Sequence, residues 1–450
     1  MQKSNLDLMV EEKPIKLLLK LGIPSVVMAL FNEINSMVDT IFAGNFIADE
    51  AVSSMAIVFP FFILVSALAF LFSEGASIAI GRYLGAKNID KANEIFNSTM
   101  FISCIISVII ACIGYFLFPY IVEFSKADSI TLFYAKTYLR YLSIGIPIIT
   151  TSIIMGKIVY IEGNTKTLLK STVIQILFNI ILNYIALAIL KIGIVGTVLA
   201  TIISFFIQGI YLYRFMTSGK MVLKLDKSKF KVTKEYFKEV IPLGLATFIT
   251  MSLLSFTFGL ESKIISSFGS SALAVQTITA NIFSATGSIA SGLMSASLVL
   301  MSYSVGAKDK QRFIEVLKLS LIIIFSATLL LNLPLVMDYK SVVSIFTDSK
   351  DIINIAKIPA YVYGMSAPLI FTTNTILYAM QPINMEKTAT TMFSLQQIIL
   401  FIPLLFILKP HGFNYAISAQ PMAETIGAII TIFLIPLFIK KLNLTFDKNL

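Results

Sequence analysis

A small set of oxygen-bearing side chains lies within long apolar stretches of this sequence, where polar groups are costly and are therefore candidates for function. One is a carboxylic acid, two are amides spaced four residues apart, and two are hydroxyls with the same spacing. In a helix this spacing puts both members of a pair on one face. They are Asp39, Asn179, Asn183, Thr197 and Thr201. Such ligands suit a hard monovalent cation, or a proton held by a buried carboxylate.

The apolar stretches should bring these side chains to a similar depth. Asp39 lies about one turn from the outer end of the first stretch, the asparagines lie in the outer half of the fifth, and the sixth runs back inward past the threonines. We therefore predict one cation- or proton-coupling site built from three helices. Hydrogen bonding between helices, with Asp39 capping a helix end, is the alternative.

Other polar residues in apolar stretches are candidates for a substrate cavity. These are Glu33, Glu74, Gln175 and Glu424. Glu33 comes six residues before Asp39 and faces another side of the same helix. Glu74 could contact a cationic substrate, or could pair with a base such as Arg82. Glu261, close to the outer end of the seventh stretch, is expected to be solvated.

Composition indicates a membrane protein. Of the 450 residues 57% are apolar and only 13% charged, and mean hydropathy is +0.86, whereas soluble domains carry about 25% charged residues. The net charge of +10 is spread over loops and forms no nucleic-acid-binding patch. Cys104, Cys112 and the single His411 support neither a disulfide framework nor a metal or histidine-based catalytic site, so we expect no cofactor and no enzyme.

Twelve stretches are long and apolar enough to span a bilayer as helices, and too long and uniform for barrel strands. They predict an all-α membrane protein of two six-helix lobes: an N-lobe over 1–216, a basic cytoplasmic linker over 217–236 and a C-lobe over 237–450. The stretches are 15–43, 51–80, 94–118, 130–160, 167–190, 193–216, 237–265, 272–304, 312–336, 352–380, 388–408 and 412–439.

The distribution of basic residues predicts the orientation. Lysine and arginine gather in the tails and in the loops after the second, sixth and eighth stretches, while the opposite loops hold acidic residues or few charges. Basic loops stay on the cytoplasmic side, so both termini should be cytoplasmic in a multi-pass protein of the cell membrane. The first twenty residues carry mixed charges without a short apolar region, which argues against a cleaved signal peptide.

The two halves resemble each other at an offset of 221 residues. Residues 85–87 (GAK) match 306–308 (GAK), Pro147 matches Pro368, and Gln175 matches Gln396. Six spans in each half make these parallel repeats, an arrangement that many secondary transporters use.

The sequence resembles the multidrug and toxic compound extrusion (MATE) family over nearly its whole length. The residues that carry the resemblance are 21–24 (LGIP), 37–44 (MVDTIFAG), 81–88 (GRYLGAKN), 162–167 (EGNTKT), 193–201 (GIVGTVLAT), 401–404 (FIPL) and 420–424 (QPMAE). The resemblance implies a two-lobed fold and the export of drug-like compounds against inward H⁺ or Na⁺. We expect the protein to be a monomer.

The resemblance also implies roles for single residues. Asp39 matches an aspartate tied to ion coupling, Asn179 and Thr201 match members of an N-lobe cation site that could hold Na⁺, and Pro24 matches a proline proposed to act as a conformational hinge. In the family an aspartate usually stands where this chain has Asn183, so the site has one negative charge fewer and Glu33 would have to compensate.

A second departure concerns the C-lobe. Members of the NorM type carry a glutamate in helix 7 and an aspartate in helix 10, where this chain reads 254–256 (LSF) and 372–374 (TTN). The chain therefore looks nearer to members with an N-lobe cation site than to the NorM type.

These observations predict a secondary antiporter that exports cationic or amphipathic xenobiotics across the bilayer in exchange for H⁺ or Na⁺. The alternative is a flippase or exporter of lipid-linked or specialised-metabolite substrates on the same two-lobed fold. That alternative favours a basic cavity, whereas the spans here carry acidic residues. An intramembrane prenyl transferase would need clustered acidic Mg²⁺ motifs, which the sequence does not contain.

Overall fold

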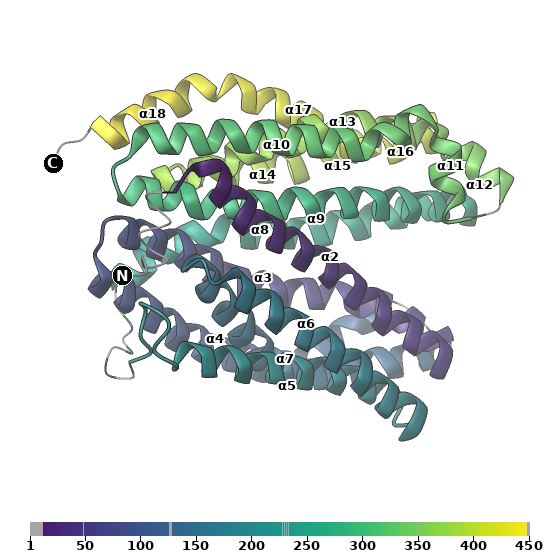
Figure 1. Cartoon of the computed structure of the whole chain (residues 1–450). Coiled ribbons are helices and arrows are strands. Elements are labelled where there is room, and N and C mark those ends of the chain that lie inside the picture. The colour runs from purple at the N-terminus through teal and green to yellow at the C-terminus, as the bar shows by residue number, and fades with distance from the viewer. Residues whose placement is uncertain are drawn as a thin grey trace. The chain divides into compact units, whose positions relative to one another are not determined.

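The computed structural model describes residues 12–447 except 48, 126, 127, 227, 229, 231, 233 and 348. Every regular element within these residues is a helix, as Figure 1 shows, so the predicted all-α fold is confirmed. Ten helices of the described part are long and apolar enough to cross a membrane, and a bent pair near the C-terminus adds an eleventh.

Helices of the first half follow the first six predicted stretches. They are α2 (Pro14–Phe46), α3 (Asp49–Gly85), α4 (Ile89–Ile121) with a short 3₁₀ turn (Val122–Ser125), α5 (Ser129–Ile161), α6 (Thr165–Tyr184) with a π-helical turn η2 (Ile185–Ile189), and α7 (Ile194–Met216). Helix α5 is the most enclosed of them and packs against α3, α4 and α7.

The second half begins with long helices and ends with broken ones. It comprises α8 (Lys234–Ile265), a 3₁₀ turn (Ser266–Phe268), α9 (Ser270–Gly306), α10 (Lys310–Met337), α11 (Tyr339–Ser344), α12 (Lys350–Ile355), α13 (Lys357–Met380), η5 (Gln381–Ile383), α14 (Glu386–Ser394), the π-helical turn η6 (Leu395–Leu400), α15 (Phe401–Leu408), η7 (Lys409–His411), α16 (Phe413–Ile417), α17 (Ala419–Phe433) and α18 (Ile435–Asp447). Helix α9 is the most enclosed and packs against α10 and α13.

Three predicted spans are less regular than their sequences indicated. The stretch 388–408 is interrupted by η6, and 412–439 divides into α16, α17 and α18, with a bend of 50° between the last two. The bend falls just before Pro436, whose ring nitrogen cannot donate to the preceding turn. Helix α13 is not among the ten helices that are long and apolar enough to span, and residues 372–375 (TTNT) lower its hydropathy.

The chain forms two compact units. The first takes in Val27–Phe248, and the second takes in Ile249–Leu450 together with Val10–Val26. Helices α2 and α8 are each divided between the two units, after Val26 and after Phe248. In the second unit the apolar core gathers residues of α8, α9, α13, α15 and α17, among them Val275, Phe401 and Leu405, all fully buried.

Each unit repeats the same backbone details at the offset of 221. Helices α3 and α9 end at Gly85 and Gly306, and two residues later Lys87 and Lys308 both take a positive φ, 58° and 56°. The next helix starts with a side-chain cap in both units: Asn88 Oδ1 accepts from the backbone of Lys91 at 3.1 Å and Asp309 Oδ1 from that of Arg312 at 2.8 Å. The internal repeat is therefore structural.

Two glycines let α3 and α8 approach closely inside the first unit. A Cβ at Gly244 would lie 1.7 Å from the carbonyl oxygen of Leu71, and a Cβ at Gly75 would lie 2.3 Å from that of Val240. No side chain can be accommodated at either point without moving a helix backbone.

We predict that Gly244→Ala lowers the free energy of unfolding by about 1–3 kcal/mol, the usual cost of overpacking. The measurement is the thermal unfolding midpoint in detergent. Gly259→Ala is the matched control, because it lies on the same helix with no atom within 4 Å of the added Cβ. It should be neutral or gain up to about 1 kcal/mol from helix propensity. Equal midpoints for the two variants would contradict the close crossing.

Candidate functional site

The carboxylate of Asp39 meets α6 and α7 inside the first unit. Asn183 donates from Nδ2 to Asp39 Oδ1 at 2.7 Å, and Thr201 donates from Oγ1 to Asp39 Oδ2 at 3.3 Å. Each carboxylate oxygen therefore has one uncharged partner from a different helix. The described part of the chain contains no group of three or more acidic, cysteine or histidine side chains that could hold a metal ion.

A second layer joins the amides to the hydroxyls. Asn183 Nδ2 also lies 3.1 Å from Asn179 Oδ1, and Asn179 donates from Nδ2 to Thr201 Oγ1 at 3.3 Å. The hydroxyl of Thr201 has a single hydrogen to share between Asp39 and the backbone oxygen of Thr197, 3.2 Å away. The five predicted coupling residues thus lie in one connected cluster.

Four of the five side chains are almost fully buried: Asn179, Asn183, Thr197 and Thr201 are at most 2% exposed. Asp39 is partly buried. Asn183 Oδ1 and Thr197 Oγ1 are buried and have no hydrogen-bond partner among the described side chains, which is costly unless something else satisfies them. Oxygen atoms of this kind are the ligands that a monovalent cation needs, so the residues fit such an ion.

Local backbone structure also marks the site. The π-helical turn η2 begins two residues after Asn183. Such turns are rare and occur often at functional sites. Tyr138 of α5 is buried and interacts electrostatically with Asp39. Sequence reasoning missed this residue, because nothing in its spacing relates it to the first helix.

The substrate-cavity candidates have defined partners. Glu74 Oε1 accepts from Lys157 Nζ at 2.7 Å, in a pair whose side chains are 7% and 11% exposed. Gln175 donates to Ser204 Oγ at 3.1 Å. Glu424 lies in the second unit and accepts from two glutamines. The side chain of Glu33 lies outside the described residues. Glu74 thus pairs with a base, although with Lys157 rather than the suggested Arg82.

The structure contradicts the expectation for Glu261 and leaves the role of Pro24 as a prediction. Pro24 lies within α2, fifteen residues before Asp39, and is partly buried; its role as a hinge stays a prediction. Glu261 is only 4% exposed, so the expectation that it is solvated is wrong. Its nearness to the helix end misled us, because packing against other helices rather than depth determines its exposure.

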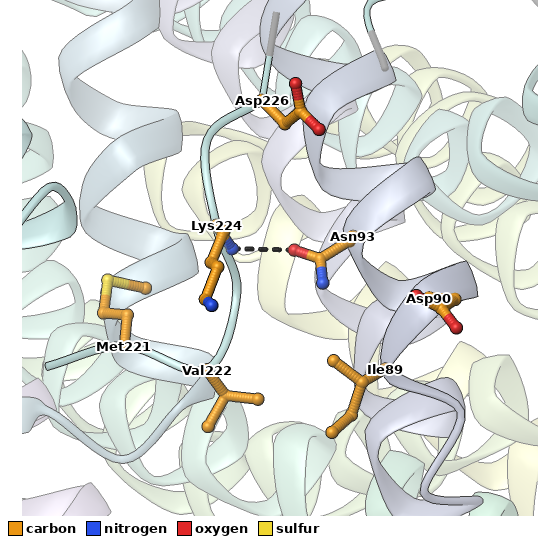
Figure 2. A pocket seen from close by; sticks show the side chains of 7 residues that line it. All are labelled: Ile89, Asp90, Asn93, Met221, Val222, Lys224 and Asp226. Carbon is orange, nitrogen blue, oxygen red and sulfur yellow. Dashed lines mark hydrogen bonds between the residues drawn. The ribbon is translucent and has the colours of Figure 1, made fainter. Parts of the chain in front are cut away.

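Part of the predicted basic linker is fixed to the first unit. Backbone N–H groups of Val222 and Leu223 donate to the two oxygens of Glu162 at 3.0 and 2.7 Å. Figure 2 shows the next contact, in which the backbone of Lys224 donates to Asn93 Oδ1 at 2.7 Å. A cavity of about 490 Å³ lies beside these contacts and is lined by Ile89, Asp90, Asn93, Met221, Val222, Lys224 and Asp226. Residues 221–226 are therefore held in place by α4 and by the end of α5.

Glu162 should make this attachment pH-dependent. Burial raises the pKa of Glu162 from 4.5 to about 7, although the two backbone hydrogen bonds act in the opposite direction. The folded protein then binds more protons than the unfolded chain between about pH 4.5 and 7. Stability contributed by Glu162 is therefore greatest below this window and falls as the pH rises through it.

We predict that Glu162→Gln, which resembles the protonated acid, stabilises the protein above about pH 7 by up to roughly 3 kcal/mol. The gain should vanish near pH 5, where the wild-type side chain is itself protonated. Thermal midpoints of both proteins in detergent at about pH 5 and pH 8 measure this. An equal difference at both pH values would contradict the assignment.

With two repeats of long apolar helices and a polar cluster buried among three of them, the fold defines a multi-pass helical membrane protein. The sequence model of the MatE family matches residues 24–185 and again 245–407. The chain therefore belongs to the MatE family and is a multi-pass membrane transporter.

Individual relatives are distant, and they match this chain over 66% or more of its length. The multidrug export protein MepA of Staphylococcus haemolyticus is 23% identical over 441 residues, which cover 97% of this chain and 96% of MepA. The probable multidrug resistance protein YoeA of Bacillus subtilis is 24% identical over 306 residues, 66% of either chain.

Solved structures agree on the fold. An outward-facing multidrug resistance MATE family transporter of the MOP superfamily superimposes with a TM-score of 0.89 at 18% identity, covering 98% of this chain and 99% of the other. A MATE structure in the bent conformation gives a TM-score of 0.90 at 18% identity over the whole of both chains. The predicted two-lobed, twelve-helix MATE fold is thereby confirmed.

Proposed function

We propose that this chain is a secondary antiporter of the cell membrane that exports drug-like, cationic or amphipathic organic compounds in exchange for inward H⁺ or Na⁺. The observation that carries the proposal is the partly buried contact of Asp39 with Asn183 and Thr201 at 2.7 and 3.3 Å. Asp39 is a single acid among neutral donors, and the nearby oxygens Asn183 Oδ1 and Thr197 Oγ1 have no hydrogen-bond partner among the described side chains. Such a site is suited to take up and release one positive charge.

Coupling follows from linkage. If the ion and the substrate favour different conformations, each weakens the binding of the other by the same factor. Ion binding at Asp39, Asn179, Asn183, Thr197 and Thr201 from outside would then favour substrate release, and substrate from inside would favour ion release. We place the chain with the family members that have an N-lobe cation site. We also propose that Pro24 is the hinge at which helix α2 bends.

The substrate class rests on the names of the relatives and on acidic residues in the spans. MepA and YoeA are named for multidrug export and resistance. Glu33, Glu74, Gln175 and Glu424 remain our candidates for contacts with a cationic substrate. We further propose that both termini are cytoplasmic and that the transporter acts as a monomer.

The test is efflux of a fluorescent cationic dye from proteoliposomes that contain the purified chain, under separately imposed Na⁺ and pH gradients. Dye movement driven by one of the gradients supports antiport and identifies the ion. Absence of movement under both gradients, with protein that is folded and inserted, would overturn the proposal.

A further inference from the structure

Helix α18, the last helix of the second unit in Figure 1, has an inner face that is fixed to this unit. Phe438 and Leu442 are each only 4% exposed. The ring centroid of Phe446 lies 5.8 Å from that of Phe313 of α10, edge to face. The three residues of α18 recur every four positions and therefore form one row along the helix. The second unit thus holds α18 along most of its length.

The outer face of α18 combines leucines with lysines. Leu437, Lys440, Lys441 and Leu444 follow one another at helical spacing and share this face. Leu437 and Leu444 are each 50% exposed, Lys440 is exposed and Lys441 is partly exposed. Bulk water does not favour such leucines, and the bilayer interior does not favour such lysines. The boundary between lipid headgroups and acyl chains accommodates both, because the lysine stems can extend along apolar surface to reach the headgroups.

The net charge of this outer face is positive. Asp447 is the one acid of α18, and it is paired with Lys310 at 3.6 Å. The charges of Lys440 and Lys441 are therefore available to an anionic partner. Each lysine close to a membrane surface strengthens binding to anionic lipid by about fivefold.

The bend before α18 brings this face to the membrane surface. Helices α16 and α17 together cover 413–433, which is about the length of roughly 20 residues that one span requires. The chain then bends by 50° into α18. A bend of this size after a completed span turns α18 toward the plane of the bilayer rather than straight out into water.

The corresponding segment of the first unit is held in another way. Residues 221–226, which follow α7, are fixed by backbone hydrogen bonds to Glu162 and Asn93. At the offset of 221, Glu162 corresponds to Ile383. Asn93 corresponds to Ile314, and neither isoleucine side chain can accept a hydrogen bond. The second unit therefore lacks these two polar attachments, and the segment after its last span is a helix with apolar residues on its outer face.

We propose that the outer face of α18 lies in the headgroup region of the bilayer and binds anionic lipid. Lys440 and Lys441 would contact the phosphate groups, and Leu437 and Leu444 would lie among the upper parts of the acyl chains. The lipid would anchor the second unit to the membrane surface at its C-terminal end. This inference does not depend on the antiport proposed above, because it concerns only where α18 lies and what it contacts.

The test uses the full chain in lipid nanodiscs of phosphatidylcholine and phosphatidylglycerol, with Cys104→Ser and Cys112→Ser replacing the two free cysteines. A fluorophore is attached at Leu437→Cys or at Leu444→Cys, both of which are exposed positions. Bromine atoms near the headgroup end of the acyl chains, on one of the two lipids at a time, quench a fluorophore that they contact.

We expect the two labels to be quenched to a similar extent, because a helix along the surface holds both at one depth. A helix that continued along the membrane normal would separate Leu437 and Leu444 by about 10 Å in depth. Clearly unequal quenching of the two labels would therefore overturn the surface position of α18.

Brominated phosphatidylglycerol should quench more strongly than the same fraction of brominated phosphatidylcholine. Lys440→Gln/Lys441→Gln should reduce this preference by about fivefold for each lysine removed. Lys340→Gln/Lys350→Gln, which removes two exposed lysines from α11 and α12 of the same unit, is the matched control and should leave the preference unchanged.

An unchanged preference in Lys440→Gln/Lys441→Gln would overturn the proposal. Labels that neither brominated lipid quenches would also overturn it. If such labels were quenched by aqueous iodide, the face would lie in water, and if they were shielded from iodide as well, a second protein chain would cover it. Failure of dye efflux in liposomes would bear on the antiport alone.

Discussion

Replacing Asp39 by asparagine is expected to reduce gradient-driven dye efflux to the level of liposomes without protein. The acid supplies the only formal charge among the five residues of the first cluster, and the asparagine cannot exchange a proton or balance the charge of Na⁺. The variant therefore loses the binding of H⁺ or Na⁺ that favours one conformation over the other. Without this differential binding the gradient can no longer shift the conformational equilibrium. The measurement is initial efflux rate under the gradient that drives the wild-type protein.

The fold should survive this change. Asparagine has nearly the shape of aspartate, and its carbonyl oxygen can still accept from Asn183 as Asp39 does at 2.7 Å. Asp128→Asn is the matched control, because Asp128 is exposed and caps α5 by accepting from the backbone of Ile130 and Thr131. Asparagine caps helices as well as aspartate does. Unchanged efflux in Asp39→Asn would contradict the role of this residue in coupling.

The contacts of Asp39 were predictable because two independent constraints converge on them. The four-residue spacings fixed the helix faces of Asn179, Asn183, Thr197 and Thr201, and the span boundaries fixed their depth. The internal repeat could also be recognised in the sequence, because Lys87 and Lys308 belong to matching GAK segments. In the structure both residues adopt a positive φ.

The burial of Glu261 in the second unit was harder to predict. Spacing along one helix says which residues share a face, but not which neighbouring helix that face meets. Glu261 is only 4% exposed, and its Oε2 accepts a hydrogen bond from Gln276 of α9, 15 positions further along the chain. The π-helical turn around Gln397 also contains no glycine or proline from which it could have been predicted.

Lys157→Met is expected to cost the first unit about 3–5 kcal/mol of unfolding free energy, because it strands the carboxylate of Glu74. The two side chains are only 11% and 7% exposed, so water screens their 2.7 Å contact poorly. Lys157 also lies 5.5 Å from the ring centroid of Tyr160, a cation–π contact that methionine cannot make. The thermal unfolding midpoint in detergent should fall by roughly 10 °C.

The cause of this loss can be separated from lost packing. If the stranded charge is responsible, the double variant Glu74→Met/Lys157→Met should recover most of the midpoint, since replacing both partners of a buried pair by apolar side chains is often neutral. Lys170→Met, an exposed lysine on α6, controls for the loss of a lysine as such. A double variant no more stable than Lys157→Met would show that packing around the lysine, rather than its charge, stabilises this part of the lobe. Recovery would leave Glu74 free of any structural requirement for charge, so that its effect on dye efflux could be tested in a folded protein.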